Sequence, residues 1–161
     1  MSYNESIPQA EAASSSLSFE QGKEAVKTTE QKSFDWKTTS FTNRYKEALD
    51  FYQSKKYREA VQRFEALLVM DRNHALSDNC QYWIGEAYFG LGSYQQAIVA
   101  FQKVFSFEKS NKNDASQLKL GICYMKLGDK EKARAELQKL INDYPASEYN
   151  GVARRFIEET Q

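Results

Sequence analysis

The feature that most constrains the fold is a short sequence that occurs three times. Residues 54–60 (SKKYREA) align with residues 91–97 (LGSYQQA) and with residues 127–133 (LGDKEKA). The alanines that end these segments are separated by 37 and 36 residues. A repeat at this interval indicates that one supersecondary unit is used several times in succession. Because such a unit cannot bury its apolar face alone, neighbouring units must stack and share a continuous core.

Each unit carries small and large residues at the spacing of two packed helices. A Gly or Ala in the first helix is followed three residues later by an aromatic residue, and an Ala in the second helix is followed four residues later by a large apolar residue. The pairs are Ala48 and Phe51, Gly85 and Tyr88, and Gly121 and Tyr124 in the first helices, and Ala60 and Phe64, Ala97 and Phe101, and Ala133 and Leu137 in the second. A small residue at a helix crossing lets the partner helix approach closely. Each unit is therefore predicted to be a helix-turn-helix, with second helices beginning near Tyr57, Tyr94 and Lys130.

This combination is the tetratricopeptide pattern. It predicts an all-α fold, a right-handed α-solenoid of three helix-turn-helix repeats at about 41–74, 78–111 and 114–147. A capping helix is expected at about 148–160, because Pro145 ends the preceding helix and apolar residues then recur on one helical face. Residues 43–161 form the repeat domain in this interpretation. The first two units lack an equivalent proline, so their second helices are expected to run on slightly.

Residues 1–42 differ in composition from the repeats. They are rich in Ser, Thr, Glu, Gln and Lys and carry few aliphatic residues. Because such a segment buries little apolar surface, we predict a polar, mostly flexible N-terminal arm. Phe34, Trp36 and Phe41 are the exceptions, and they indicate either a docking peptide or packing against the first helix.

A narrower resemblance rests on residues 78–88 (DNCQYWIGEAY), 118–121 (LKLG) and 127–134 (LGDKEKAR), together with Tyr144 and Pro145. These segments resemble the C-terminal domain of the YbgF/CpoB family of Tol-Pal-associated periplasmic proteins. The resemblance implies a non-catalytic adaptor that binds a TolA-like protein and coordinates outer-membrane constriction with cell-wall synthesis at division. It implies a periplasmic location if a leader is missing from this chain, and we expect a cytoplasmic one if the sequence is complete as written.

The first helices of stacked helix pairs line the concave side, and positions 5, 9 and 12 of each unit share one helical face. Eight of these nine positions are apolar or aromatic when the units are counted from residues 41, 78 and 114. A surface that only had to be solvated would not need such residues. We therefore predict a partner-binding groove, called the candidate groove below. Its residues are Tyr45, Leu49, Tyr52, Tyr82, Trp83, Glu86, Phe89, Leu118, Lys119, Ile122 and Met125.

Three interpretations of the candidate groove are open at this stage. A helical or extended partner peptide would place its anchors against Tyr82, Trp83 and Phe89. Alternatively, the curvature of the array buries much of the groove internally, or the N-terminal arm lies in it. Glu86 and Lys119 are expected within reach of each other across two repeats. Either the two residues form a half-exposed salt bridge worth at most about 1 kcal/mol, or Glu86 binds a basic residue or a backbone N–H of the partner.

A receptor for acidic C-terminal tails, as in chaperone-binding tetratricopeptide domains, uses Lys, Asn and Arg at five defined positions. This chain has Tyr45, Leu49, Trp83, Ala115 and Lys119 there, so only the last position matches. Binding of that kind is not expected. The alternative to a monomeric adaptor is a structural protein that self-assembles through its arm or its apolar groove.

Composition and motifs argue against several other classes of protein. Lys plus Arg and Asp plus Glu number 22 each, so no net charge draws the chain to nucleic acid, and no apolar run suits membrane insertion. Cys80 and Cys123 match no metal or disulfide pattern and are expected to be buried. His74 falls in a loop without partners for a catalytic triad, and no glycine-rich phosphate-binding motif occurs. We predict no enzyme, no cofactor and no metal.

Overall fold

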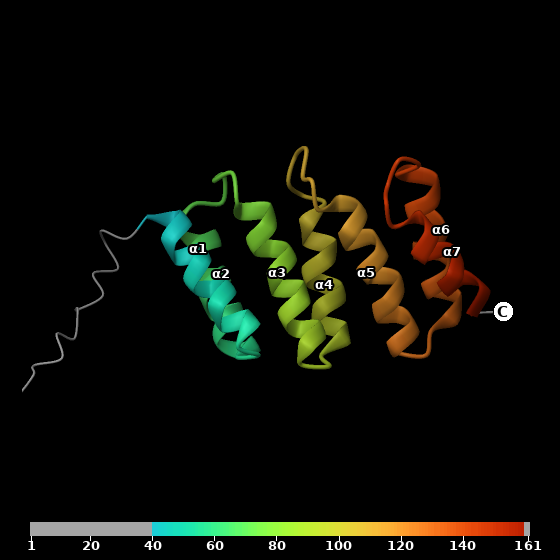
Figure 1. Cartoon of the computed structure of the whole chain (residues 1–161), viewed down its shortest axis with the longest axis horizontal. Coiled ribbons are helices and arrows are strands. Elements are labelled where there is room, and N and C mark those ends of the chain that lie inside the picture. The colour runs from blue at the N-terminus through green and yellow to red at the C-terminus, as the bar shows by residue number, and fades with distance from the viewer. Residues whose placement is uncertain (1–39, 160–161) are drawn as a thin grey trace, which may run out of the picture. The chain divides into compact units, whose positions relative to one another are not determined.

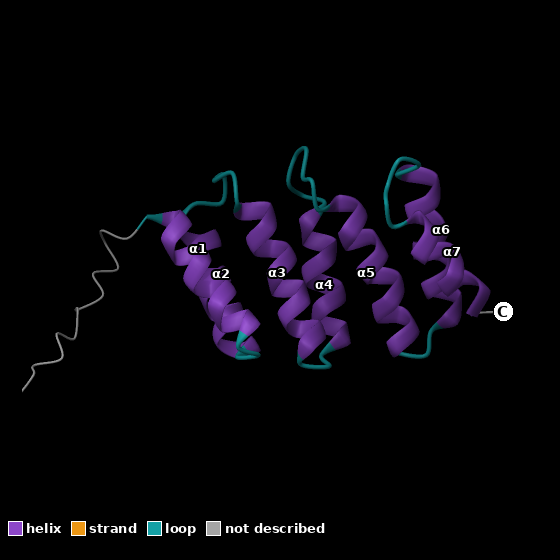
Figure 2. Ribbon diagram, in the orientation of Figure 1, coloured by secondary structure: helices purple, strands orange, loops and turns teal. Residues whose placement is uncertain are grey.

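The computed structural model describes residues 40–159, which form seven α-helices and no strand within that range (Figures 1 and 2). The all-α prediction is confirmed. The expected N-terminal arm lies outside the described residues, apart from its last few positions. The helices are α1 (Phe41–Gln53), α2 (Tyr57–Met70), α3 (Ser77–Gly90), α4 (Tyr94–Val104), α5 (Asn113–Lys126), α6 (Lys130–Asp143) and α7 (Asn150–Glu159).

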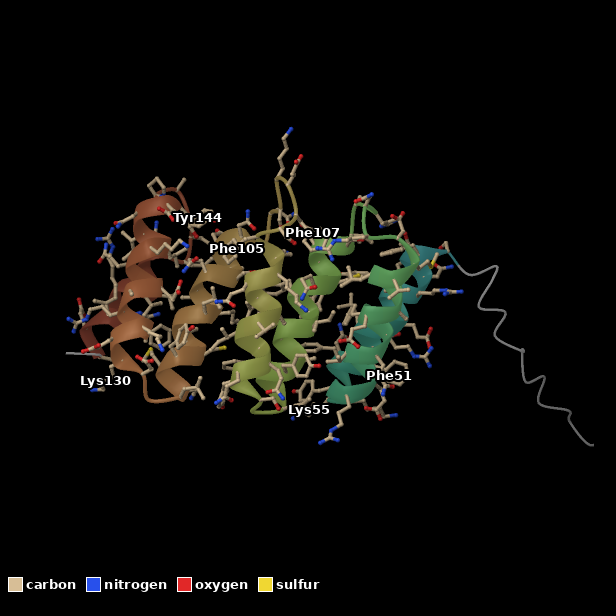
Figure 3. The ribbon with its side chains drawn as sticks, turned by 180° about the vertical axis from the view of Figure 1, so that it is seen from behind. Phe51, Lys55, Phe105, Phe107, Lys130 and Tyr144 are labelled. Atoms are coloured by element: carbon tan, nitrogen blue, oxygen red, sulfur yellow. The ribbon has the colours of Figure 1, made fainter. Side chains whose placement is uncertain are left out.

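Each helix packs against the next along the chain, from α1 through to α7. This order matches three helix-turn-helix repeats and a capping helix, as predicted. The short turns within repeats lie along one edge of the array, where Figure 3 labels Lys55 and Lys130. The connections between repeats lie along the opposite edge, near Phe105, Phe107 and Tyr144 (Figure 3). Sequence neighbours are therefore also spatial neighbours, as a solenoid requires.

The turns within the repeats explain where the second helices begin. Gly92 and Gly128 adopt positive φ angles of 71° and 80°, which end α3 and α5 at the C-terminal side. Lys55 takes the equivalent place in the first unit with φ 59°, a left-handed conformation that disfavours a side chain. Asp129 then caps α6, because its side chain accepts a hydrogen bond from the backbone N–H of Lys132 at 3.0 Å.

The predicted close helix crossings occur at Gly85 and Gly121. A Cβ atom at Gly85 would lie 2.5 Å from the ring of Phe101, and one at Gly121 would lie 2.6 Å from the side chain of Leu137. Both of these large residues are fully buried. The glycines thus make room for the next helix, which confirms the repeat register.

Two polar contacts recur from one repeat to the next. The buried amide of Gln81 donates to the backbone oxygen of Ala100 at 3.0 Å, and Gln117 donates to the backbone oxygen of Glu136 at 3.0 Å. Each amide ties the first helix of its repeat to the second. Because a buried polar group is costly when it lacks a partner, these bonds also specify how the two helices pack.

The expectation that the second helices of the first two units run on slightly is wrong. Helix α4 has 11 residues and is shorter than α6, while α2 has the same 14 residues as α6. At the end of α2, Asp71 leaves the helical conformation and its side chain accepts from the backbone N–H of Asn73 at 2.9 Å. After α4, the hydroxyl of Ser106 donates to the backbone oxygen of Lys103 at 2.7 Å. Local side-chain bonds of this kind compete with helix continuation, so a proline is not needed.

Candidate functional site

The residues of the candidate groove come from α1, α3 and α5, the first helices of the three repeats. None of the eleven side chains is freely exposed: Leu118 is buried and the other ten are half-buried. The groove is therefore less open than its sequence suggests. Part of each half-buried side chain packs against its neighbours, and the remainder is exposed.

Trp83 is the centre of an aromatic cluster that joins α1 to α3. Its indole N–H donates to the hydroxyl oxygen of Tyr45 at 2.8 Å. The rings of Tyr52 and Tyr82 lie with centroids 4.9 Å and 5.7 Å from that of Trp83, in tilted and edge-on arrangements. Such contacts add to the free energy gained by burial alone. The first two repeats therefore present one rigid aromatic surface.

Glu86 and Lys119 form the predicted ion pair across two repeats. The ammonium nitrogen lies 2.8 Å from one carboxylate oxygen and 2.9 Å from the other. The side chains of Glu86 and Lys119 are 11% and 22% exposed, so the pair is more buried than the half-exposed bridge considered above. The same nitrogen lies 4.9 Å from the ring centroid of Phe89. A charged pair thus sits inside the aromatic surface.

Two tyrosine hydroxyls share the environment of Glu86. Burial raises the pKa of Tyr52 to about 12, and the nearby Glu86 carboxylate adds to the shift because it disfavours a second negative charge. Burial also raises the pKa of Tyr82, again with a contribution from Glu86. Both hydroxyls therefore remain protonated at neutral pH and able to donate hydrogen bonds.

The third repeat contributes to the candidate groove in a different way. Leu118, Ile122 and Met125 belong to one hydrophobic cluster with residues of α7, including Val152 and Phe156. The capping helix therefore shares in covering the apolar residues of α5. The aromatic part of the candidate groove belongs to the first two repeats, and Lys119 is the polar residue that α5 adds to it.

His74 and Phe41 have a structural role that sequence reasoning missed. Phe41 is 5% exposed and stacks on the ring of His74 with centroids 3.8 Å apart. The Nδ1 atom of His74 accepts from the backbone N–H of Leu76 at 3.1 Å. The imidazole thus anchors the start of α1 to the loop after α2. Phe34 and Trp36, the other apolar residues of the expected arm, lie outside the described residues.

The two cysteines are buried free thiols, as predicted. Burial raises the pKa of both Cys80 and Cys123 to about 12. Within residues 40–159, no group of three or more His, Cys, Asp or Glu side chains is placed to hold a metal ion. In the same range, every helix is too short or too polar to cross a membrane.

A hollow of about 720 Å³ lies outside the candidate groove, between α2 and α4 and over α3. Sequence reasoning missed it because the predicted site was confined to the first helices. Two valines in its walls, Val69 and Val99, are exposed large apolar residues. The repeat alignment distinguishes Val69, because the equivalent positions in the second and third units hold the polar residues Ser106 and Asn142.

Comparisons with known proteins agree on the fold. The Yersinia enterocolitica type III secretion chaperone SycD, in complex with a peptide of the translocator YopD, is 24% identical with a TM-score of 0.61 over 76% of this chain and 94% of that one. The Arabidopsis OM64 TPR domain is 17% identical with a TM-score of 0.62 over 75% and 96%. The second TPR domain of human RPAP3, in complex with an HSP70 peptide, is 13% identical with a TM-score of 0.61 over 74% and 92%. No curated protein sequence matches the chain.

Two family models, both described as tetratricopeptide repeat, match residues 45–110 and 88–155. Together they span residues 45–155, which include α2 to α6 and most of α1 and α7. Both models are general ones, so the narrower resemblance to the YbgF/CpoB family stays a prediction. The chain belongs to the tetratricopeptide repeat family, whose stacked helix pairs form extended surfaces that bind other proteins.

Proposed function

We propose that this protein is a non-catalytic adaptor that binds a peptide segment of another protein in the candidate groove. The observation that carries the proposal is the half-buried aromatic surface of Tyr52, Trp83 and Phe89 around the pair of Glu86 and Lys119. Rigid aromatic rings provide contact area at a low cost in conformational entropy. Polar groups placed among them fix the orientation of a ligand.

The polar groups of the candidate groove favour one class of ligand. Lys119 is already paired with both oxygens of Glu86, so it is not available as a receptor for a free carboxylate. The other positions of the clamp for acidic tails hold apolar or aromatic residues such as Leu49. The HSP70 peptide bound by the RPAP3 domain, SGPTIEEVD, is acidic. We therefore propose a segment with apolar anchors and few carboxylates, whose N–H donors approach Glu86 and the tyrosine hydroxyls.

The test uses selection of peptides from a random library on the purified chain, followed by measurement of the dissociation constant of the best peptide. Replacing Trp83 and Phe89 together by Ala should weaken that peptide at least about tenfold while the helix content stays nearly intact. Val99→Ala, an apolar substitution on the outer face of α4, is the matched control. If the double variant binds as well as the wild type, or if it unfolds, the candidate groove is not the binding site.

The narrower proposal names the partner. We propose a TolA-like protein of the bacterial envelope, in the periplasm, on the basis of the resemblance at residues 78–88 and 127–134. The experiment is titration of this chain with the purified periplasmic part of TolA from a Tol-Pal system. Binding that is lost in the Trp83 and Phe89 double variant supports the proposal. If TolA does not bind while a selected peptide does, the narrower proposal fails and the general one stands.

A further inference from the structure

Apolar residues contribute to the floor and to both walls of the hollow between α2 and α4, beside polar and charged side chains. Helices α2 and α4 both pack on α3, and the hollow opens between them. Its floor includes Ile84 and Tyr88 of α3, and its walls include Leu68 and Val69 of α2 and Val99 of α4. The side chain of Val69 is 88% exposed and that of Val99 is 51% exposed. Exposed apolar residues beside a hollow with other apolar residues in it indicate a surface that another molecule covers.

The repeat alignment shows that this surface is particular to the first two units. The positions equivalent to Val69 hold Ser106 and Asn142 in the second and third units. The positions equivalent to Val99 hold Gln62 in the first unit and Ala135 in the third. Because the repeat does not require valine at either position, the pair of valines has no explanation in the internal packing of a repeat.

The charges on the α2 side of the hollow are separated along its length. Glu65 lines the hollow one turn before Val69, and Arg72 lines it three residues after Val69. Lys103 lines it from α4, at the position equivalent to Ala66 of the first unit. Arg72 donates to the hydroxyl of Ser106 at 3.0 Å, and its guanidinium lies 4.8 Å from the ring centroid of Phe107. Figure 3 labels Phe107 in the loop after α4.

Within residues 40–159, Glu65, Arg72 and Lys103 form no ion pair. The α2 side of the hollow therefore presents an acid before Val69 and a base after it. Glu65 lies in α2, and Arg72 lies two residues beyond Met70, the last residue of that helix.

We propose that this surface binds a second copy of the chain, with the two α2 helices antiparallel about a two-fold axis. The midpoint between Glu65 and Arg72 falls between Leu68 and Val69. A two-fold axis at that point places Glu65 of each copy against Arg72 of the other, and Val69 of each copy at the hollow of the other. An isologous contact requires this self-complementarity. The proposal goes beyond the candidate groove, which stays open in such a dimer.

The test measures the mass of the full chain by sedimentation equilibrium from about 1 µM to 1 mM, a range that covers weak and moderate affinities. The wild type should pass from the 18.6 kDa of one chain to twice that mass as concentration rises. Val69→Asp places two like charges beside the axis. Glu65→Arg and Arg72→Glu each create repulsion at both ion pairs. Each of the three substitutions should raise the dimer dissociation constant at least about tenfold.

A mixture of the two charge variants gives the decisive result. When Glu65→Arg and Arg72→Glu chains are combined, every cross-axis contact again joins an acid to a base, so the mixture should form heterodimers. Glu158→Arg, the same charge change at the other end of the array on α7, is the matched control and should dimerise like the wild type. Three results would overturn the proposal. These are a monomer at every concentration, a dimer that the substitutions leave intact, and charge variants that stay monomeric when mixed.

Discussion

Alanine substitution should have opposite effects on stability at two glycines, Gly85 at a close helix crossing and Gly151 on an open surface. A Cβ atom at Gly85 would lie 2.5, 2.7 and 2.8 Å from three atoms of the Phe101 ring. A ring is rigid and Phe101 is fully buried, so the crossing itself must open. At Gly151 in α7, by contrast, an added Cβ would meet nothing within 4 Å. Alanine should therefore destabilise the protein at the first site and stabilise it at the second.

The magnitude follows from two opposing contributions. Overpacking a core costs about 1–3 kcal/mol, and replacing a helical Gly by Ala recovers about 1 kcal/mol of helix propensity. Because three ring atoms at Phe101 are too close, we place the overpacking cost in the upper part of its range. Gly85→Ala should lower the free energy of unfolding by about 1–2 kcal/mol, which is a fall in Tm of roughly 4–8 °C for a domain of this size. Gly151→Ala should raise it by up to about 1 kcal/mol.

The assay is urea unfolding followed by circular dichroism, with calorimetry for Tm. A second variant, Gly85→Ala combined with Phe101→Leu, should be more stable than the sum of the two single changes predicts, because a flexible side chain yields to the new methyl group. If Gly85→Ala is as stable as the wild type, the close crossing does not exist in solution. If the double variant is simply additive, the ring of Phe101 is not the obstacle.

Three further predictions concern other sites. Glu86→Gln leaves Lys119 without its carboxylate and should cost about 1–3 kcal/mol of unfolding free energy; adding Lys119→Met should recover part of it, and an additive double-mutant cycle would refute the ion pair. Folding raises the pKa of Tyr52 from its usual value near 10 to about 12. Between these two pH values the folded state therefore holds a proton that the unfolded state has lost. Stability from this group should therefore be present below pH 10 and disappear towards pH 12. Tyr52→Phe should reduce the fall in unfolding free energy between pH 10 and pH 12. An unchanged slope in this range would contradict the role given to Tyr52. Lys55→Gly removes a side chain from a left-handed residue and should stabilise by about 1 kcal/mol, as chemical denaturation would measure.

The contacts that recur in every repeat were readable from the sequence. The starts of α2, α4 and α6 and the crossings at Gly85 and Gly121 follow from residues repeated at a fixed interval, so a single alignment locates them. The pair of Glu86 and Lys119 was also within reach of sequence reasoning, because each lies on the same face of adjacent first helices. The ends of α2 and α4 were not, because side chains such as Ser106 stop the helix through local bonds that no repeat pattern displays.

The sequence by itself determined the family, the helices and their order, because helix formation and stacking depend on periodic apolar residues within each unit. Only the tertiary structure decided how far each groove residue is buried, because burial depends on side chains that other helices bring close. Leu118 is covered within a cluster that α7 joins, and Trp83 is held by a hydroxyl group 38 residues earlier in the chain. The hollow beside Val69 also depends on the tertiary structure, because it forms only where α2 and α4 both pack on α3 and leave a space between them.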